Sequence, residues 1–191
     1  MGGTFDPIHN GHLVAAGELR DVADLEQVWL MPNARPPHRR LPVAGADDRM
    51  RMVELALTGK PSLLASRLEI ERGGISYTID TVRELRDRFP GQRFELLLGS
   101  DAALQIGQWH EAAAVLKEAA FVIFNRPGTA LARDEIQELG FRQEHTRLVH
   151  LDSPPIAAHD VRERIQRGAS IEGLVPQNVA AYIREHHLYG A

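Results

Sequence analysis

The sequence predicts an α/β fold, a doubly wound open parallel sheet with helices on both faces, and two observations support this prediction. Short apolar runs alternate along the chain with stretches in which apolar residues recur at helical spacing. The apolar runs are continuous, as in strands that are covered on both faces of a sheet. With 191 residues the chain can bury a full core. We therefore expect one domain over residues 1–191, with a C-terminal helical part at about 157–191.

Four apolar runs predict strands, because each has strand length and is followed by residues that stop a strand. They are residues 28–31, 94–98, 120–124 and 148–151. Pro-rich or Gly-containing segments follow each of the four. These strands are expected to be buried in the sheet.

Amphipathic stretches between the strands predict helices at about 50–57, 79–89, 161–168 and 179–186, and a further helix begins near Gly11. Asp47 or Asp48 could cap the helix at 50–57. Gly168 is well placed as the residue just after the end of its helix. Residues 125–145 show the weakest pattern of the chain.

Composition excludes several classes of protein. The 22 Lys and Arg residues against 26 Asp and Glu give a net charge of −4 without long single-sign runs, which argues against a dedicated nucleic-acid binder. The longest wholly apolar stretch, residues 119–124, is far shorter than the ~20 residues of a membrane helix, and no signal peptide is visible. The absence of cysteine excludes disulfides, thiolate catalysis and cysteine-based metal sites. We expect a soluble, cytoplasmic protein without nucleic-acid or membrane partners and with unknown oligomeric state.

The N-terminal sequence GGTFDPIHNGHL, residues 2–13, carries the strongest chemical signal. Gly2 and Gly3 allow backbone amides to approach an anion, and a helix starting shortly afterwards would add its dipole. His9 and His12 share one face if both lie in the first helical turn. Two imidazoles there would stabilise charge on phosphorus. The alternative is a Gly/Pro turn with two solvent-exposed histidines. Two ligands make a poor metal site, so no protein metal site is predicted.

The same stretch resembles the (T/S)-F-D-P-x-H-x-G-H signature of the nucleotidyltransferase superfamily and matches each of its defined positions. Further segments narrow the resemblance, namely residues 32–39, 76–81, 99–101, 109–110, 126–128 and 174–189. In this order they are similar to bacterial nicotinate-nucleotide adenylyltransferases across essentially the whole chain. That family transfers AMP from ATP to nicotinate mononucleotide, giving deamido-NAD and pyrophosphate, with Mg²⁺ assisting.

The resemblance implies that His9, His12 and Arg39 are catalytic. The histidines would hold the ATP phosphates and stabilise charge at the α-phosphoryl group, and Arg39 would lie against phosphate. Direct in-line attack by the mononucleotide phosphate needs no protein nucleophile. On sequence alone, Arg39 and Arg40 also fit a mobile surface loop. The ATP-binding residues implied are Gly3, Thr4, Phe5, His9, Gly11, His12, Gly99, Asp101, Ile156, His159 and Arg162.

The resemblance also implies a mononucleotide site made by Gly2, Gly3, Ser76, Tyr77, Thr78, Trp109 and Arg126. Ser76, Tyr77 and Thr78 would offer backbone amides and a hydroxyl to the nicotinate carboxylate; they also fit the N-terminal cap of the next helix, and the two roles are compatible. Trp109 would stack on the pyridine ring, whereas the sequence without the resemblance favours a core position for this tryptophan. We expect a preference for nicotinate over nicotinamide.

The chain departs from the family pattern at residues 156–162. The family carries I-S-(S/A)-T-x-(I/V)-R, whereas this sequence reads IAAHDVR and lacks both flanking hydroxyls. Backbone N–H groups at a helix N-terminus can still bind an anion. His159 could act as the cap or as a phosphate donor, or Asp160 could cap the helix and repel phosphate. We hypothesise that His159 and Arg162 keep the site working with weaker ATP binding.

A second departure is at the front of the chain. Family members have a short apolar strand before the Gly-Gly-Thr-Phe segment, whereas this sequence starts at Met1. We expect a truncated first strand, which leaves backbone groups of its neighbours unpaired. Either the recorded start is a few residues late, or the chain is short and unstable or inactive. Two other functions stay open: a relative that uses phosphopantetheine or another substrate, and a nucleotide-binding remnant without turnover.

Overall fold

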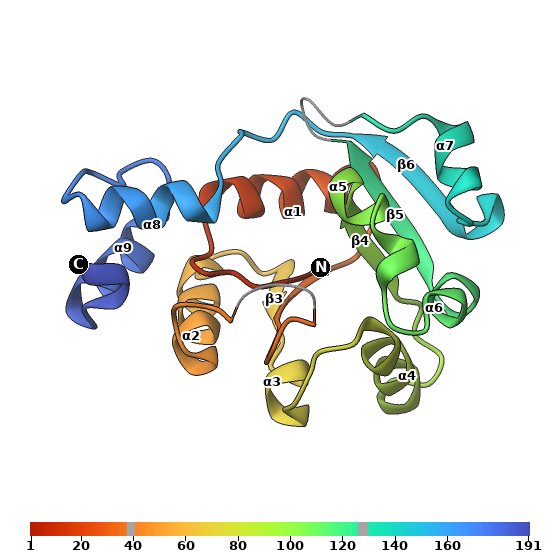
Figure 1. Ribbon diagram of the computed structural model, residues 1–191, viewed down its shortest axis with the longest axis horizontal. Helices are drawn as coiled ribbons and strands as arrows, with labels where there is room; N and C mark the ends of the chain where they lie inside the picture. The colour runs from red at the N-terminus through yellow and green to blue at the C-terminus, as the bar shows by residue number, and fades with distance from the viewer. Residues whose placement is uncertain (38–40, 126–129) are drawn as a thin grey trace.

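The computed structural model describes residues 1–37, 41–125 and 130–191. Within them the parallel strands form two three-stranded sheets, with the orders β1-β2-β3 and β4-β5-β6 (Figure 1). The strands are β1 (Gly2–Gly3), β2 (Val28–Pro32), β3 (Leu63–Ala65), β4 (Glu95–Gly99), β5 (Ala120–Asn125) and β6 (Thr146–His150).

Helices follow or cover the strands of both sheets. The α-helices are α1 (Asn10–Val22), α2 (Ala46–Ala56), α3 (Leu68–Arg72), α4 (Thr78–Arg88), α5 (Ser100–Ala103), α6 (Ala112–Glu118), α7 (Arg133–Glu138), α8 (Ala158–Gln166) and α9 (Gln177–Glu185). Short 3₁₀ turns are η1 (Ile106–Gln108), η2 (Gln143–His145) and η3 (Leu188–Gly190). Figure 1 shows α8 and α9 at one end of the molecule and the second sheet with α4, α6 and α7 at the other. None of the helices in the described ranges is long and apolar enough to cross a lipid bilayer.

The α/β class with parallel strands is confirmed. The four predicted strands are present with boundaries within two residues of those expected, and the four predicted helices begin one to four residues earlier than their apolar pattern. The single continuous sheet is not observed. β1 has two residues and pairs with β2, as Gly2 opposite Met31 and Gly3 opposite Pro32. The parallel strands of the described chain therefore form two sheets instead of one.

The strand register brings the carboxyl ends of the strands to common edges. Gly3 pairs with Pro32 in the first sheet, and Gly99 pairs with Phe124 in the second. The loops that leave β1, β2, β4 and β5 therefore start next to one another within each sheet. Open α/β sheets bind ligands at this edge.

Three apolar clusters fill the interior of the described chain. The first apolar cluster joins β2, β4 and β5 to α1, α2, α8, α9 and η3, and it includes Phe5, Leu30 and Val161. The second apolar cluster lies under β4 and β5 and includes Ile79, Ile106 and Phe121. Removing these side chains from water is the main favourable contribution to folding. The first cluster thus spans both sheets, with Leu97 and Phe124 from the second, and the third cluster consists of Met31, Leu68 and Leu85.

Helix ends follow the sequence only in part. Gly168 has φ 65° and donates its backbone N–H to the carbonyl of Ile165, so its predicted place after α8 is confirmed. The predicted caps of α2 are wrong, because the N-cap residue is Gly45. Asp47 and Asp48 instead lie in the first turn, where their negative charge interacts favourably with the helix dipole.

Candidate active site

A cleft of about 1310 Å³ is lined by both ends of β2 and β4 and includes the carboxyl ends of β1, β2 and β4. It is lined from the first sheet by the loop after β1, from the second sheet by the residues after β4, and from the C-terminal part by the start of α8. The sequence-predicted residues that line it are Gly2, Gly3, Thr4, Phe5, His9, His12, Ser76, Tyr77, Thr78, Gly99, Asp101, Trp109, Ile156, His159 and Arg162. Arg39 and Arg126 were also predicted, and they lie outside the described residues.

His9 and His12 form a reciprocal pair at the start of α1. The backbone N–H of His12 donates to Nδ1 of His9 at 3.3 Å, and the backbone N–H of His9 donates to Nδ1 of His12 at 3.3 Å. The two rings stack with centroids 3.6 Å apart and an interplanar angle of 21°. His9 is 5% exposed, so the alternative of two solvent histidines is wrong for this residue. The predicted shared face of the two imidazoles is confirmed.

This pair of hydrogen bonds fixes the tautomer of both imidazoles. A ring nitrogen that accepts a backbone N–H carries no proton of its own. In the neutral form the proton of each ring is therefore on Nε2, which becomes a donor. His9 and His12 thus each use one ring nitrogen at the helix start, and both residues line the cleft.

Gly11 lets the start of α1 pack closely against its surroundings. A Cβ atom at this position would lie 3.1 Å from Nδ1 of His9 and 3.2 Å from the carbonyl oxygen of Pro154. Both distances are shorter than nearly all real Cβ contacts. Gly11 does not line the cleft, so it acts by allowing the approach of the segment that leads into α8. Phe5 is 2% exposed and meets the ring of His12 edge-on at 5.0 Å, so its side chain supports the histidine from the core.

Arg49 is a buried residue of the site that the sequence did not indicate. Its side chain is 1% exposed, and its Nη1 donates to the carbonyl of Thr4 at 2.8 Å. Its Nη2 donates to the carbonyl of Asn33 at 2.7 Å, and its Nε donates to the carbonyl of Ala44 at 3.3 Å. Burial lowers the pKa of Arg49, and the charge of Asp6 opposes this shift. One guanidinium thus holds together three segments at the cleft.

The start of α8 presents backbone amides without a side-chain cap among the described residues. Its N-cap residue is Ala157. His159 is exposed, and its Nε2 lies 3.1 Å from Oδ1 of Asp160. Neither residue caps the helix, so the predicted caps are wrong at both positions. The backbone amides of the first turn are therefore not capped by either side chain and can bind an anion.

At the start of α4 the hydroxyl of Ser76 is used inside the protein. Ser76 is 7% exposed, and its hydroxyl oxygen accepts the backbone N–H of Ala34 at 2.9 Å. The backbone N–H of Ser76 also donates, to the carbonyl of Arg35. Ser76 is thus bonded to main-chain groups of residues 34 and 35, and its role toward a substrate carboxylate stays a prediction.

Thr78 begins α4 with a backbone N–H that has no acceptor in the described part of the chain. The same holds for the next two amides, as is general for the first turn of a helix. Ser76 and Tyr77 hold this end of the helix in the cleft, since the backbone N–H of Tyr77 donates to the carbonyl of Ile75. The helix start is thus a fixed set of donors.

Glu69 anchors this helix start from below. Its carboxylate is 7% exposed and accepts the hydroxyl of Thr81 at 2.7 Å. Arg72 donates to the same hydroxyl at 2.9 Å. Burial raises the pKa of Glu69, against the hydrogen bonds from Thr81 and Ser76 and the charge of Arg72, which lower it. Sequence reasoning missed Glu69 because nothing local marks a glutamate in a short helix as buried.

Aromatic residues form the opposite wall of the same end of the cleft. The ring of Tyr77 stacks on His110 with centroids 4.1 Å apart and an interplanar angle of 28°. Trp109 is half-buried, lines the cleft and packs against the second apolar cluster. The two sequence interpretations of Trp109, ring platform and core residue, are thus both compatible with its position.

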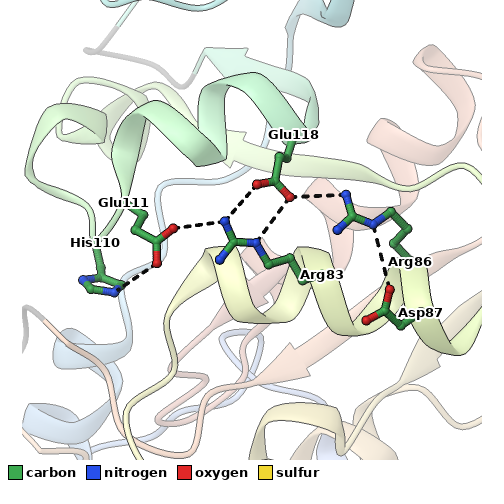
Figure 2. A network of polar contacts seen from close by, with 6 residues as sticks. All are labelled: Arg83, Arg86, Asp87, His110, Glu111 and Glu118. Atoms are coloured by element: carbon green, nitrogen blue, oxygen red, sulfur yellow. Dashed lines mark hydrogen bonds and ion pairs between the residues drawn. The ribbon is translucent and has the colours of Figure 1, made fainter.

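Figure 2 shows a chain of charges that ties this wall to α4. Arg83 donates to Glu118 at 2.9 Å and to Glu111 at 3.0 Å, and Oε1 of Glu111 lies 3.6 Å from Nε2 of His110. Arg83 is on the helix that begins at Thr78, whereas Glu111 follows Trp109 and His110 directly. The network therefore keeps the aromatic wall in register with the helix start.

Comparison with known proteins gives a consistent family. The model of the family described as cytidylyltransferase-like matches residues 1–164. A protein of Frankia casuarinae named "Probable nicotinate-nucleotide adenylyltransferase" is 42% identical over 192 residues, which cover 99% of this chain and 98% of that protein. A protein of Geobacillus thermodenitrificans with the same name is 37% identical over 194 residues, covering 100% and 85% of the two chains.

The chain belongs to the nicotinate-nucleotide adenylyltransferase family. A solved structure gives the same fold. It is titled as nicotinic acid mononucleotide adenylyltransferase of Plasmodium falciparum complexed with NaAD, and it superposes with a TM-score of 0.83 and 20% sequence identity over 98% of this chain and 94% of that chain. A second structure of the Plasmodium protein, complexed with APC, gives a TM-score of 0.82. The nucleotidyltransferase fold predicted from the motifs is confirmed.

Proposed function

We propose that this family member transfers AMP from ATP to nicotinate mononucleotide, giving deamido-NAD and pyrophosphate. The observation that carries the proposal is the stacked pair His9 and His12, which lines the same cleft as the residues that begin α4 and α8. The start of α8 can then hold phosphates of ATP and the start of α4 the nicotinate carboxylate. The α-phosphorus of ATP would lie between the two helix starts. The family relationship gives the substrates for this arrangement.

In the proposed step an oxygen of the mononucleotide phosphate attacks the α-phosphorus of ATP. A new P–O bond forms at the α-phosphorus, the bond from that phosphorus to the oxygen bridging to the β-phosphate breaks, and pyrophosphate leaves with the electron pair. No proton has to move, since the attacking phosphate is an anion. The residues His9 and His12 donate hydrogen bonds to the charge that builds up, which is the main requirement of such transfers.

On the ATP side, the first-turn amides of α8 and the side chain of Arg162 face the cleft. His159 is exposed beside them and is retained as a phosphate donor in this proposal. The backbone of Gly3 and Thr4 completes the phosphate site. Because the amides belong to the main chain, they supply an anion site despite the lost family hydroxyls.

On the mononucleotide side, the amide of Thr78 and those after it receive the nicotinate carboxylate, and Trp109 lies along the pyridine ring. A carboxylate is favoured at a helix N-terminus by its charge, whereas the neutral amide of nicotinamide gains less. The proposal therefore includes a preference for nicotinate. The Plasmodium structures complexed with NaAD and with APC support a cleft of this shape as a dinucleotide site.

Mg²⁺ enters the proposal together with ATP. In the described residues no group of three or more His, Asp or Glu side chains could hold a metal ion. Asp101 is exposed in the cleft next to the end of β4. Mg²⁺ is commonly bound by one or two carboxylates together with substrate phosphates. The carboxylate of Asp101 fits this mode of binding. When bound, it neutralises charge on the phosphates. An ATP-dependent reaction also agrees with the cytoplasmic location expected from the sequence.

The test is pyrophosphate release by the purified protein with ATP and Mg²⁺. Nicotinate mononucleotide, nicotinamide mononucleotide and phosphopantetheine are offered separately. We expect release with nicotinate mononucleotide and a lower kcat/KM with the nicotinamide compound. Release with phosphopantetheine alone would assign the protein to the related substrate class. Binding of nicotinate mononucleotide without release from any acceptor would identify a nucleotide-binding remnant.

A further inference from the structure

Asp6 is the most completely bonded carboxylate near the ATP side of the cleft. It is 5% exposed, and its Oδ2 accepts the backbone N–H of Val43 at 2.8 Å. Its Oδ1 accepts the backbone N–H of Ala44 at 3.1 Å and the hydroxyl of Tyr189 at 2.7 Å. Three donors thus fix the orientation of one buried carboxylate, and one of them comes from 183 residues away in the chain.

The main chain of Asp6 in turn holds Arg162. Nη1 of Arg162 donates to the carbonyl of Asp6 at 2.6 Å and lies 4.0 Å from Oδ2 of the same residue. The Nε and Nη2 atoms of Arg162 make no hydrogen bond within the described ranges, and the side chain lines the cleft. One edge of the guanidinium is therefore tied down while the other faces the ATP side.

Tyr189 is held in an unusual conformation that directs its hydroxyl to Asp6. Its φ is 62°, a left-handed value that is strained for a bulky side chain, and its ring is 6% exposed within the first apolar cluster. Burial raises the pKa of Tyr189, and the charge of Asp6 raises it further, so the hydroxyl stays protonated and donates. Such strain persists only where the surroundings fix it.

The turn that carries Tyr189 also packs on the helix that carries Arg162. Contacts join η3 to α8 and to α9. Tyr189 and Arg162 therefore approach Asp6 from the same C-terminal unit, one through the carboxylate and the other through the carbonyl. If the hydroxyl of Tyr189 were removed, Oδ1 of Asp6 would keep one hydrogen-bond donor, the backbone N–H of Ala44.

We propose that Tyr189 is a positioning residue for ATP binding, which acts through Asp6 to keep the free edge of Arg162 aimed at the phosphate site. This inference rests on the proposed function only for the identity of the anion that Arg162 meets. Tyr189 itself touches no substrate. Its loss should weaken the binding of ATP and leave the distant mononucleotide end of the cleft unchanged.

The chain offers a matched control. Tyr182 on α9 also donates its hydroxyl to an aspartate, Asp48, at 2.9 Å, and it does not line the cleft. The variants Tyr189→Phe and Tyr182→Phe thus each delete one tyrosine–carboxylate hydrogen bond from the C-terminal part. The test measures binding of a non-hydrolysable ATP analogue and of nicotinate mononucleotide by calorimetry, then the KM for each substrate and kcat.

For Tyr189→Phe we expect the Kd for the ATP analogue to rise about tenfold, the size of a lost hydrogen bond to a charged group. The Kd for nicotinate mononucleotide should stay unchanged, as should both constants in Tyr182→Phe. In an Arg162→Ala background the Tyr189→Phe change should have little further effect, because the route through Arg162 is already removed. Equal weakening of both substrates, or equal effects of the two tyrosine variants, would overturn the proposal.

If Tyr189→Phe is too unstable to assay, Asp6→Asn serves as the second variant. It leaves Tyr189 packed in place and changes the group that faces Arg162, so the same selective loss of ATP-analogue affinity is expected. An Asp6→Asn protein that folds and binds the analogue normally would also overturn the proposal. Pyrophosphate release by the unaltered protein is scored separately, so a failure of the proposed reaction is distinguishable from a failure of the binding measurement.

Discussion

His9 and His12 cap the first helix through each other: each Nδ1 accepts the backbone N–H of the other residue at 3.3 Å. Each residue therefore contributes to stability through one ring nitrogen, and both residues line the cleft. The two contributions can be separated, because an asparagine places its amide oxygen near the position of Nδ1 but has no group at the position of Nε2.

The first prediction uses this difference at His12. His12→Asn should keep the cap, so its free energy of unfolding should stay within about 1 kcal/mol of that of the unaltered protein. In His12→Ala the free energy of unfolding should fall by about that amount or more, as for a lost cap. Both variants should lose about 10²–10³-fold in kcat, the usual effect of deleting a donor to a developing charge. Urea unfolding and pyrophosphate release give the two values. Near-normal kcat in His12→Asn would remove His12 from the catalytic pair.

The second prediction concerns Trp109. Trp109→Ala should raise the KM for nicotinate mononucleotide by roughly 2- to 12-fold, which corresponds to the loss of an aromatic stacking contact. The KM for ATP should stay unchanged, and Trp109→Phe should restore part of the loss. Steady-state kinetics with each substrate varied in turn checks this. A rise in the KM for ATP of the same size would indicate that Trp109 acts only through the core.

The third prediction concerns the pH dependence of stability. Because the folded-state pKa of Glu69 is raised above the ordinary value of 4.5, the folded protein binds this proton more tightly than the unfolded chain. The stability due to the neutral form is present below about pH 4.5 and is lost as pH rises through the folded pKa. Relative to Glu69→Gln, the unaltered protein should therefore lose free energy of unfolding with rising pH.

The measurement is urea unfolding of both proteins from pH 4 upward. The Met1 ammonium, whose pKa burial lowers from 8.0 to about 6, contributes the opposite slope between pH 6 and 8. The charges of the Met1 ammonium and Glu69 interact, so the two proteins are compared below about pH 6, where the Met1 ammonium stays protonated. Parallel pH curves for the two proteins would contradict the prediction.

The fourth prediction concerns Arg49. Arg49→Met fills similar space but leaves the carbonyls of Thr4, Asn33 and Ala44 without their donor and Asp6 without a nearby positive charge. We expect the free energy of unfolding to fall by roughly 3–5 kcal/mol, as when one partner of a buried charged network is removed. Arg51→Met is the control, since Arg51 is exposed on the same helix and pairs with Glu54. Similar losses in both variants would show that Arg49 is not the anchor.

The sequence was sufficient to predict the helices and strands that have a regular apolar pattern, and to identify the motif near the start of the chain. Residues 120–124 could be recognised because a continuous apolar run indicates a buried strand wherever it occurs, and His9 and His12 because their spacing places them on one helical turn. The strand β3, of three residues, and the helix α3, of five, are too short to show a period. The same limit applies to α7, in the stretch with the weakest pattern.

Contacts between distant segments could not be read from the sequence. Arg49 looks like one more charged residue on an amphipathic helix, and its burial depends on three loops that converge only after folding. Ser76 matches the family motif, yet in the fold its hydroxyl oxygen also accepts the backbone N–H of the distant Ala34. The helix at residues 158–166 was expected to use His159 or Asp160 as its cap, whereas the chain enters the helix at Ala157 and leaves both side chains outside.

Different apolar clusters stand behind the two sides of the cleft. Phe5 and Val161, which stand behind the proposed ATP side, belong to the first cluster, whereas Ile79 and Trp109, at the proposed mononucleotide side, belong to or pack against the second. Substitutions that reshape the second cluster can therefore alter the choice of acceptor while the adenylyl donor stays in place. A protein divided in this way can acquire a new acceptor by mutation at one end, without having to rebuild the chemistry it already has at the other.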